Sequence, residues 1–394
     1  MYPAENGDSF LLCANGINIL VDGGYARTFD NYILNDLKIL NTNGESLDLL
    51  ITTHIDADHI GGIVQLLSMN GSSDESKIIP IRNIWHNSLR SLTSRNELNI
   101  PFQPGDLEVL NAIKRRGHPV LTIQTDEILK EISAKQGSTL ASLIHSGGYS
   151  WNGSDGAKAI SFESNQNANL KGGLVNVITP SKLRLNKLLK FWQKNIRNSG
   201  YRGPTGSGDF TDDAFEFTYE HLNEKPYSAP SLISAGRRRI LKDIYTPDTS
   251  ITNGSSIATI ISLGGMRLLM LADAWAEDVL EALLELKSSG VSMSFDGIKI
   301  SHHGSFRNTS PELLGLIDAP NYFISSNGSK HNHPDIELLV AIVERPANFP
   351  RTLYFNYSTT ASNEIREYKT KSATSFSVVE NATDWIKISE NELC

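Results

Sequence analysis

The sequence predicts an α/β fold with mixed sheets, and two observations lead to this prediction. Short apolar runs of strand length alternate with amphipathic stretches of helix length in both halves of the chain. Each half also contains a hairpin early in its course. Asn15-Gly16 joins two short strands near the start, and Gly264-Gly265 divides the apolar stretch at 257–271. Helical connections favour parallel strands, and the hairpins add antiparallel ones.

The elements of the first half are predicted from turn residues and hydrophobic periodicity. The run at 48–53 contains the consecutive apolar residues Leu49, Leu50 and Ile51, which is typical of a parallel strand covered on both faces. A helix is predicted at 181–196 because its apolar residues recur at helical spacing after Ser181, a favourable N-cap. The same criteria predict strands at 9–14, 17–22, 79–85 and 174–178, and helices at 29–40, 59–67, 106–116 and 127–146.

Residues from about 198 to 250 interrupt this rhythm. They are rich in glycine and proline and carry mixed charge, which indicates an insertion or a long functional loop. We therefore predict a single domain over residues 1–394 with an insertion at about 198–250. After it, the pattern predicts a hairpin at 257–271, helices at 275–289, 311–317 and 336–344, and strands at 297–300 and 322–325.

Composition and charge indicate a soluble globular protein. The chain has 394 residues, 39% of them hydrophobic and 20% charged, and a net charge of −8. This negative sum argues against attraction of the whole molecule to nucleic acid or to an anionic membrane. No run reaches the roughly 20 apolar residues of a membrane-spanning helix, and the first residues do not form a secretory signal. The two cysteines, Cys13 and Cys394, provide no disulfide framework. We expect a cytoplasmic protein without a membrane partner.

Metal-type ligands are concentrated in one segment directly after the strand at 48–53. His54, Asp56, Asp58 and His59 lie there within six residues. Alternate residues of an extended turn project to one side, and His59 falls on the first turn of the next helix. Imidazole and carboxylate groups bind divalent metals, and strand carboxyl ends in open α/β sheets hold ligands. The pattern favours a metal site over a polar turn with an Asp N-cap.

The spacing His54-x-Asp56-x-Asp58-His59 resembles the His-x-His-x-Asp-His motif of the metallo-β-lactamase fold, with Asp56 in the place of the second His. This resemblance implies a four-layer αββα sandwich of the metallo-β-lactamase type with a long insertion. Further segments agree with the family in their order along the chain. They are Val21-Asp22-Gly23-Gly24, Leu271-Ala272-Asp273 and Ile300-Ser301-His302-His303-Gly304-Ser305.

One branch of that family is especially similar, the soluble hydrolase domain of the bacterial competence DNA-uptake channel, which also has free-standing relatives. The resemblance covers about 1–90 and 250–345, and DNA import itself is not implied because the channel part is absent. The segments that carry it, besides those above, are Gly7-Asp8-Ser9, Asn253-Gly254-Ser255-Ser256 and His331-Asn332-His333-Pro334.

The resemblance implies ligands for one or two divalent ions. We prefer His302 to His303 because the family ligand follows its strand directly. Asp58 would also orient the nucleophilic water, and His303 or His333 would protonate the leaving group. The implied first metal takes Asp58, His59, Asp273 and His302, and the second takes His54, Asp56 and Asp273.

One family position differs in this chain. The family often has another His after a middle strand, where this chain has Thr179-Pro180-Ser181. His86 or His145 can replace it, and the alternative for His86 is a packing role. Asp56 adds an oxygen ligand, which shifts the preference from Zn²⁺ towards Mn²⁺ or Mg²⁺. We expect Zn²⁺ or Mn²⁺ first, with Mg²⁺ as a further candidate.

A basic segment suggests the substrate. Residues 182–202 contain seven Lys and Arg and no acid, and their apolar positions fit one helical face. Arg237-Arg238-Arg239 adds a second basic cluster. The pattern favours a polyanion, and the alternative is a solvated face balanced by acids elsewhere. The predicted substrate-binding residues are Lys187 and Lys194 on this helix, with His331 and His333 at another strand end.

These features predict a metal-dependent hydrolase that uses a metal-activated hydroxide. Phosphodiester bonds, including those of nucleic acid, are the preferred substrate, because the branch resembled contains phosphodiesterases and nucleases. Two alternatives are a hydrolase of a non-nucleotide ester or lactone and a weakly catalytic binding component of a bacterial defence-type system.

Overall fold

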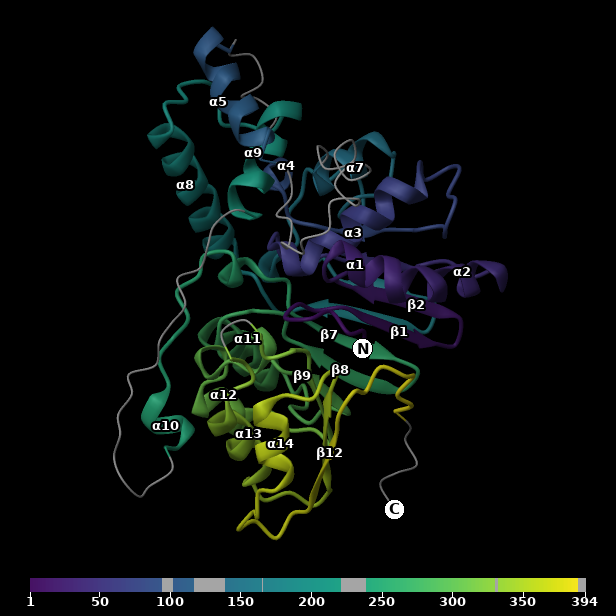
Figure 1. Ribbon diagram of the computed structural model, residues 1–394, viewed down its shortest axis with the longest axis vertical. Coiled ribbons are helices and arrows are strands. Elements are labelled where there is room, and N and C mark those ends of the chain that lie inside the picture. Colours follow the sequence, from purple (N-terminus) through teal and green to yellow (C-terminus); the bar gives the residue numbers. More distant parts are fainter. Residues whose placement is uncertain (94–101, 117–138, 165, 221–238, 330–331, 389–394) are drawn as a thin grey trace. The chain divides into compact units, whose positions relative to one another are not determined.

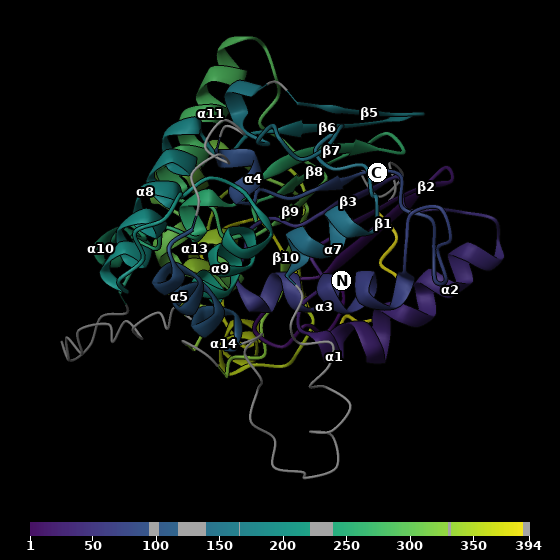
Figure 2. The same ribbon diagram turned by 90° about the horizontal axis from the view of Figure 1, so that it is seen from above.

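The computed structural model describes residues 1–93, 102–116, 139–164, 166–220, 239–329 and 332–388. The chain divides into two compact units that we describe separately. The N-terminal unit comprises Phe10–Ile160 and Lys182–Asn223, and the C-terminal unit comprises Met1–Ser9, Ser161–Ser181 and Glu224–Cys394. Each unit contains one sheet and its own helices (Figures 1 and 2). The predicted α/β class with mixed sheets is confirmed.

The sheet of the N-terminal unit has the order β1-β2-β3-β4. β1 and β2 form the predicted hairpin, and Asn15 and Gly16 adopt the left-handed backbone that a two-residue turn requires, with φ of 53° and 75°. β2, β3 and β4 are parallel, so their carboxyl ends share one edge. The strands are β1 (Phe10–Ala14), β2 (Ile17–Val21), β3 (Leu49–Ile51) and β4 (Ile84–Trp85).

The helices of this unit form one continuous series of contacts. α3 contacts α1 and α7, α9 contacts α7, α5 and α4, and α4 contacts α8. α1 (Ala26–Thr28) continues through a π-helical turn, Phe29–Ile33, into α2 (Leu34–Thr42). The others are α3 (Ala57–Asn70), α4 (Leu89–Leu92), α5 (Pro104–Lys114), α7 (Leu140–Ser146), α8 (Lys182–Asn198) and α9 (Asp209–Glu220).

Three predictions in this unit need correction or limits. The strand predicted at 79–85 is reduced to the two residues of β4, because Pro80 and the polar residues after it lack a continuous partner. The predicted insertion is not a continuous loop, since α9 lies within it and buries Phe215 and Phe217. Residues 127–138, which make up most of the helix predicted at 127–146, lie outside the described residues. Arg237 and Arg238 of the second basic cluster also lie outside them.

The sheet of the C-terminal unit has eight strands in the order β12-β11-β10-β9-β8-β7-β6-β5. β5 to β8 pair antiparallel, and β8 to β12 pair parallel. Gly264 and Gly265 form the turn of the predicted β7–β8 hairpin. The strands are β5 (Ala168–Leu170), β6 (Gly173–Val177), β7 (Thr259–Leu263), β8 (Met266–Met270), β9 (Gly297–Lys299), β10 (Asn321–Ile324), β11 (Arg351–Phe355) and β12 (Phe376–Val379).

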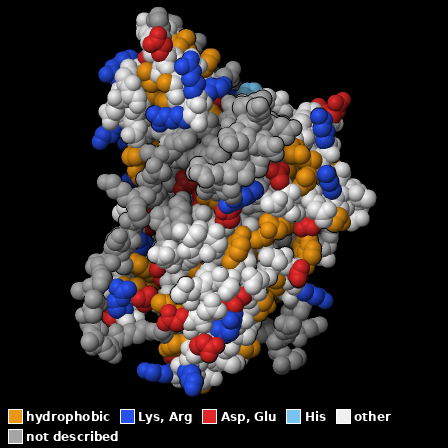
Figure 3. Space-filling model, viewed as in Figure 1, with side chains coloured by type: hydrophobic (Ala, Val, Ile, Leu, Met, Phe, Trp, Pro, Cys, Tyr) orange, Lys and Arg blue, Asp and Glu red, His pale blue; other side chains and the backbone are white. Residues whose placement is uncertain are grey.

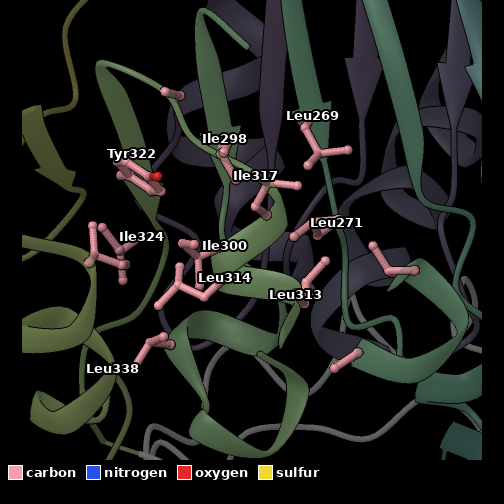
Figure 4. Close-up of a cluster of buried hydrophobic side chains, with 14 of the residues drawn as sticks. Leu269, Leu271, Ile298, Ile300, Leu313, Leu314, Ile317, Tyr322, Ile324 and Leu338 are labelled. Carbon is pink, nitrogen blue, oxygen red and sulfur yellow. The ribbon is translucent and has the colours of Figure 1, made fainter. Parts of the chain in front are cut away.

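The core of this unit lies between the parallel strands and their helices. Buried side chains of β8, β9 and β10 meet those of α12 and α13, as Figure 4 shows for Ile298, Leu313 and Leu338. This burial positions the strand ends that carry the candidate ligands. The helices are α10 (Leu241–Ile244), α11 (Ala276–Ser288), α12 (Pro311–Leu316), α13 (Ile336–Val343) and α14 (Thr360–Arg366).

Both sheets place chemically active residues just after parallel strands. In the N-terminal unit, Asp22, His54 and His86 follow β2, β3 and β4. In the C-terminal unit, Asp273 and His302 follow β8 and β9. Such carboxyl-terminal edges are the usual ligand sites of open α/β sheets. Among the described helices, none has the length and apolar composition needed to cross a membrane.

Candidate metal centre

The first donor set lies between β3 and the first turn of α3. His54 and His59 have ring centroids 4.1 Å apart, and His54 Nε2 lies 3.4 Å from Asp56 Oδ2. Asp58 lies beside His59 in the first turn of α3. Asp58, His54 and His59 are buried, whereas Asp56 is partly exposed. The four predicted ligands therefore lie together in one short segment. Imidazole nitrogens and carboxylate oxygens suit a divalent metal.

Asp22, at the end of β2, fixes the orientation of His59. Its Oδ2 lies 2.8 Å from His59 Nδ1, so Nδ1 carries the proton and Nε2 is the nitrogen that can bind a metal. Thr53 donates its N–H to Asp22 Oδ1 at 2.8 Å and its hydroxyl to Oδ2 at 2.7 Å. Asp22 is fully buried and supports the donor set, as the resemblance implies.

Glycines allow the loop after β2 to approach α3. Gly23 N–H donates to His59 O at 2.9 Å, and Gly62 N–H donates to Gly24 O at 2.7 Å. A Cβ added to Gly62 would lie 2.0 Å from Gly23 O. Only glycine fits this approach, which holds Asp22 beside His59.

The second donor set belongs to the C-terminal unit. Asp273 Oδ2 lies 3.8 Å from His302 Nε2 and 3.5 Å from His303 Nε2, and the three residues offer ligand atoms within 4.8 Å of one another. Both histidines have left-handed backbone, with φ of 47° and 56°. Such strained backbone is uncommon outside glycine and often accompanies functional sites. Either histidine can therefore accompany Asp273, and the preference for His302 stays a prediction.

His303 has two acidic neighbours. Its Nδ1 lies 3.4 Å from Asp8 Oδ1 and 3.1 Å from Ser325 O. Burial alone would lower the pKa of His303, but the charges of Asp273 and Asp8 raise it to about 9. Lys299, which is also buried, pairs with Asp8 and lies 3.8 Å from Asp273 Oδ1. From the sequence, Asp8 was identified only as part of a motif, and Lys299 was not a candidate.

His333 lies beside His302, with ring centroids 5.4 Å apart. Its Nδ1 is 3.3 Å from Asp335 Oδ2, and burial lowers the pKa of His333. The structure thus brings one predicted proton donor close to the second donor set. His331, the neighbouring prediction, lies outside the described residues.

His86 has a different environment. Its Nε2 lies 2.8 Å from Glu216 Oε1, and both side chains are fully buried. Glu216 also accepts the N–H groups of Leu140 and Ala141 at the start of α7. Among the described residues, His86 joins no group of three metal-type donors, whereas His145 is exposed at the end of α7. These contacts favour the packing role for His86, and the Glu216 partner could not be found from the sequence.

α8 is amphipathic as predicted. Leu185, Leu188 and Trp192 are buried, while Lys187 and Lys194 are exposed. Figure 3 shows blue side chains over the region where α5 and α8 lie in Figure 1. The predicted basic face therefore points outward within this unit.

Comparison with known proteins supplies the family context of the first donor set. Residues 2–69 match the family model of the metallo-beta-lactamase superfamily. This range includes Asp22 and the segment from His54 to His59. No curated protein matches the chain. With the two mixed sheets, the match supports the metallo-β-lactamase type of fold, and with the donor sets it supports a metal-dependent hydrolase. The similarity to the competence-channel hydrolase stays a prediction.

Proposed function

We propose that the protein is a metal-dependent hydrolase of phosphodiester bonds. One observation carries the proposal: each unit has His and Asp donors just after parallel strands, and a buried partner orients a histidine among them. We adopt the ligand assignment implied by the resemblance, for one or two ions. The proposed ligands are His54, Asp56, Asp58, His59, Asp273 and His302.

The chain's residues have separate roles in this proposal. A bound divalent ion supplies an acidified water and neutralises charge on the phosphoryl oxygens. Asp58 accepts a hydrogen bond from the attacking water and directs it at phosphorus. His303 or His333 gives a proton to the leaving oxygen. Asp56 adds an oxygen donor that favours Mn²⁺, or Mg²⁺, beside Zn²⁺.

The phosphodiester substrate is supported by α8. Lys187, Lys190, Lys194 and Arg197 are exposed at spacings of three and four residues, so they form one stripe on the helix. At 1.5 Å per residue the stripe is about 15 Å long, and phosphates on a DNA strand recur about every 3.4 Å along the duplex axis. The stripe therefore spans about four such repeats, and its four cations can contact phosphates along this stretch of a strand. We propose that Lys187 and Lys194 bind substrate there, with His331 and His333 contacting the scissile phosphate.

Metal analysis and a paired hydrolysis assay test the proposal. The purified protein, Asp58→Ala and His59→Ala would be assayed on bis-p-nitrophenyl phosphate and labelled DNA with Zn²⁺, Mn²⁺ or Mg²⁺. Asp74→Ala and His145→Ala are matched controls because both positions are exposed. We expect about one or two equivalents of metal, and hydrolysis that is lost in the first two variants but kept in the controls.

Two results would contradict the proposal at different levels. Stoichiometric metal with cleavage of esters or lactones, but of no phosphodiester, would refute the substrate and retain the hydrolase. No bound metal and no turnover on any substrate would refute the hydrolase and favour a binding role.

A further inference from the structure

We propose that Asn308 is a positioning residue that holds His302 in the tautomer needed for metal binding, with Asp248 holding Asn308 in turn. The inference rests on the proposed function, because it concerns a ligand of the same centre. All three residues belong to the C-terminal unit. Asn308 and Asp248 were not candidates from the sequence.

The orientation of the Asn308 amide follows from its neighbours. Its Nδ2 donates to Asp248 Oδ2 at 3.0 Å and to the backbone oxygen of Asp273 at 3.1 Å. An ionised carboxylate and a carbonyl only accept hydrogen bonds, so the NH₂ group must face them. Asn308 Oδ1 consequently faces His302 Nδ1, 2.8 Å away. Because Oδ1 can only accept, His302 Nδ1 carries the proton and Nε2 has the lone pair.

A competing contact is weaker. Asn253 Nδ2 lies 3.5 Å from His302 Nδ1, but it lies only 2.8 Å from Asp248 Oδ2. A protonated Nδ1 cannot accept from an amide NH₂ group, and 3.5 Å is long for a hydrogen bond. Asp248 is therefore the partner of both amides. It is buried and also accepts the N–H groups of Thr249 and Ser250, at 2.6 and 3.0 Å.

One amide thus fixes two proposed ligands. Asn308, which is fully buried at the end of a 3₁₀ turn, holds the His302 ring and the backbone of Asp273. His302 Nε2 then lies 3.8 Å from Asp273 Oδ2. His303 Nδ1 also faces acceptors, Asp8 and Ser325 O, so its Nε2 points away from them. The Asn308 contact therefore concerns how His302 is held, and the choice of His302 over His303 still follows the family resemblance.

The tautomer of His302 is the decisive measurement, and it needs no metal. Nitrogen NMR of ¹⁵N-histidine-labelled, metal-free protein would report the protonated nitrogen, with the His302 signals assigned by loss in His302→Gln. We expect Nδ1–H in the wild type and a shift towards Nε2–H in Asn308→Ala. In the double variant Asn308→Asp, Asp248→Asn, a carboxylate again accepts from Nδ1 and an amide again donates to position 308, so Nδ1–H should return.

Metal affinity is the second readout. Loss of a group that orients a ligand typically weakens metal binding 10- to 100-fold, so we expect this loss in Asn308→Ala. Recovery in the double variant should be partial, because a carboxylate at position 308 cannot donate to the Asp273 backbone oxygen. Asn356→Ala is the matched control. Asn356 is a buried amide of the same unit that bonds to Ser326 N and Tyr2 O. It should lower thermal stability without changing the His302 tautomer.

The outcomes separate this inference from the proposed function. An unchanged tautomer in Asn308→Ala would overturn the positioning role, whatever the activity. A shifted tautomer with unchanged metal affinity would also overturn it and leave Asn308 with a structural role. Failure of the wild type to bind metal would refute the proposed function, and with it the metal-positioning role, while the tautomer data would still report the Asn308–His302 contact.

Discussion

Replacing Asp22 tests the assignment of His59 more sharply than replacing His59 itself. Asp22 Oδ2 accepts from Thr53 Oγ1 and from His59 Nδ1, and Oδ1 accepts from Thr53 N–H. In Asp22→Asn, the remaining oxygen can keep the Thr53 N–H bond, and an NH₂ group replaces Oδ2. His59 Nδ1 can then form a hydrogen bond with this NH₂ group only as the acceptor. Its proton would move to Nε2, the nitrogen that a metal requires.

Asp22→Ala has a different effect, because it removes the acceptors and imposes no tautomer. Loss of such a partner typically weakens metal binding 10- to 100-fold, which corresponds to about 1.4 to 2.7 kcal/mol. We expect this range for Asp22→Ala and its upper end or beyond for Asp22→Asn. The free energy of unfolding should change in the opposite order, with the larger loss in Asp22→Ala. Asp22→Ala leaves buried donors without acceptors, at about 1–3 kcal/mol each, whereas Asn keeps part of the network.

Two measurements rank Asp22→Ala and Asp22→Asn by metal affinity and by stability. Competition against a fluorescent chelator measures metal affinity, and urea unfolding of the metal-free protein measures the free energy of unfolding. Asp48→Asn and Asp48→Ala are the controls, because the Asp48 carboxylate accepts from Asn18 N–H in the same unit but outside the donor set. The reasoning would be refuted if metal affinity followed stability, with Ala worse than Asn in both measurements, or if neither substitution changed it.

Three further predictions concern backbone fit, pH and salt. Gly62→Ala places a Cβ 2.0 Å from Gly23 O and should lower the free energy of unfolding by roughly 2–4 kcal/mol in urea titrations. Burial raises the pKa of Asp212 to about 7, so the folded protein keeps a proton that the unfolded chain releases above about pH 4. Stability should therefore fall between pH 4 and 7, and Asp212→Asn should flatten that fall. Charge reversal at Lys187 and Lys194 should weaken DNA binding and reduce the slope of log affinity against log salt by about 2.

Each of these predictions has a matched control. Gly105→Ala adds a Cβ with no atom within 4 Å in α5 and should not lower the free energy of unfolding, because alanine is the better helix former. Asp74→Asn removes an exposed carboxyl and should leave the pH profile unchanged. Reversal of Lys38 and Lys77 gives the same change in net charge at exposed positions off α8, and an equal effect on DNA binding would contradict a dedicated basic face.

Much of the fold could be predicted because its signals are local. A two-residue glycine turn or an uninterrupted apolar run identifies itself within a few residues, and β1, β2, α3 and the β7–β8 hairpin follow such signals. β4 was predicted too long because apolar content at 79–85 cannot show how many of its residues find a partner strand. Pairing depends on distant residues, which periodicity does not report.

The candidate ligands were also accessible from the sequence, because spacing after a strand has a direct geometric meaning. Their partners were not. Glu216 meets His86 across 130 positions, and Asp248 meets Asn308 across 60. A polar residue in a loop gives no sign in its own sequence of which histidine it will face. The tertiary structure selects those partners, so the orientation of a ligand is less predictable than its identity.

The two donor sets share a property that packing alone does not require. A buried histidine with a purely structural role is satisfied in either tautomer, provided that its surroundings match. Here a carboxylate faces His59 Nδ1 in one unit, and an amide oxygen faces His302 Nδ1 in the other. Each acceptor is itself held by further hydrogen bonds. Thr53 donates to Asp22, and the NH₂ group of Asn308 donates to Asp248 and to the backbone oxygen of Asp273. Different chemical groups thus impose the same protonated nitrogen on both rings. That shared outcome is what metal binding through Nε2 demands, and it makes the tautomers of these two histidines the most direct physical test of the proposed centre.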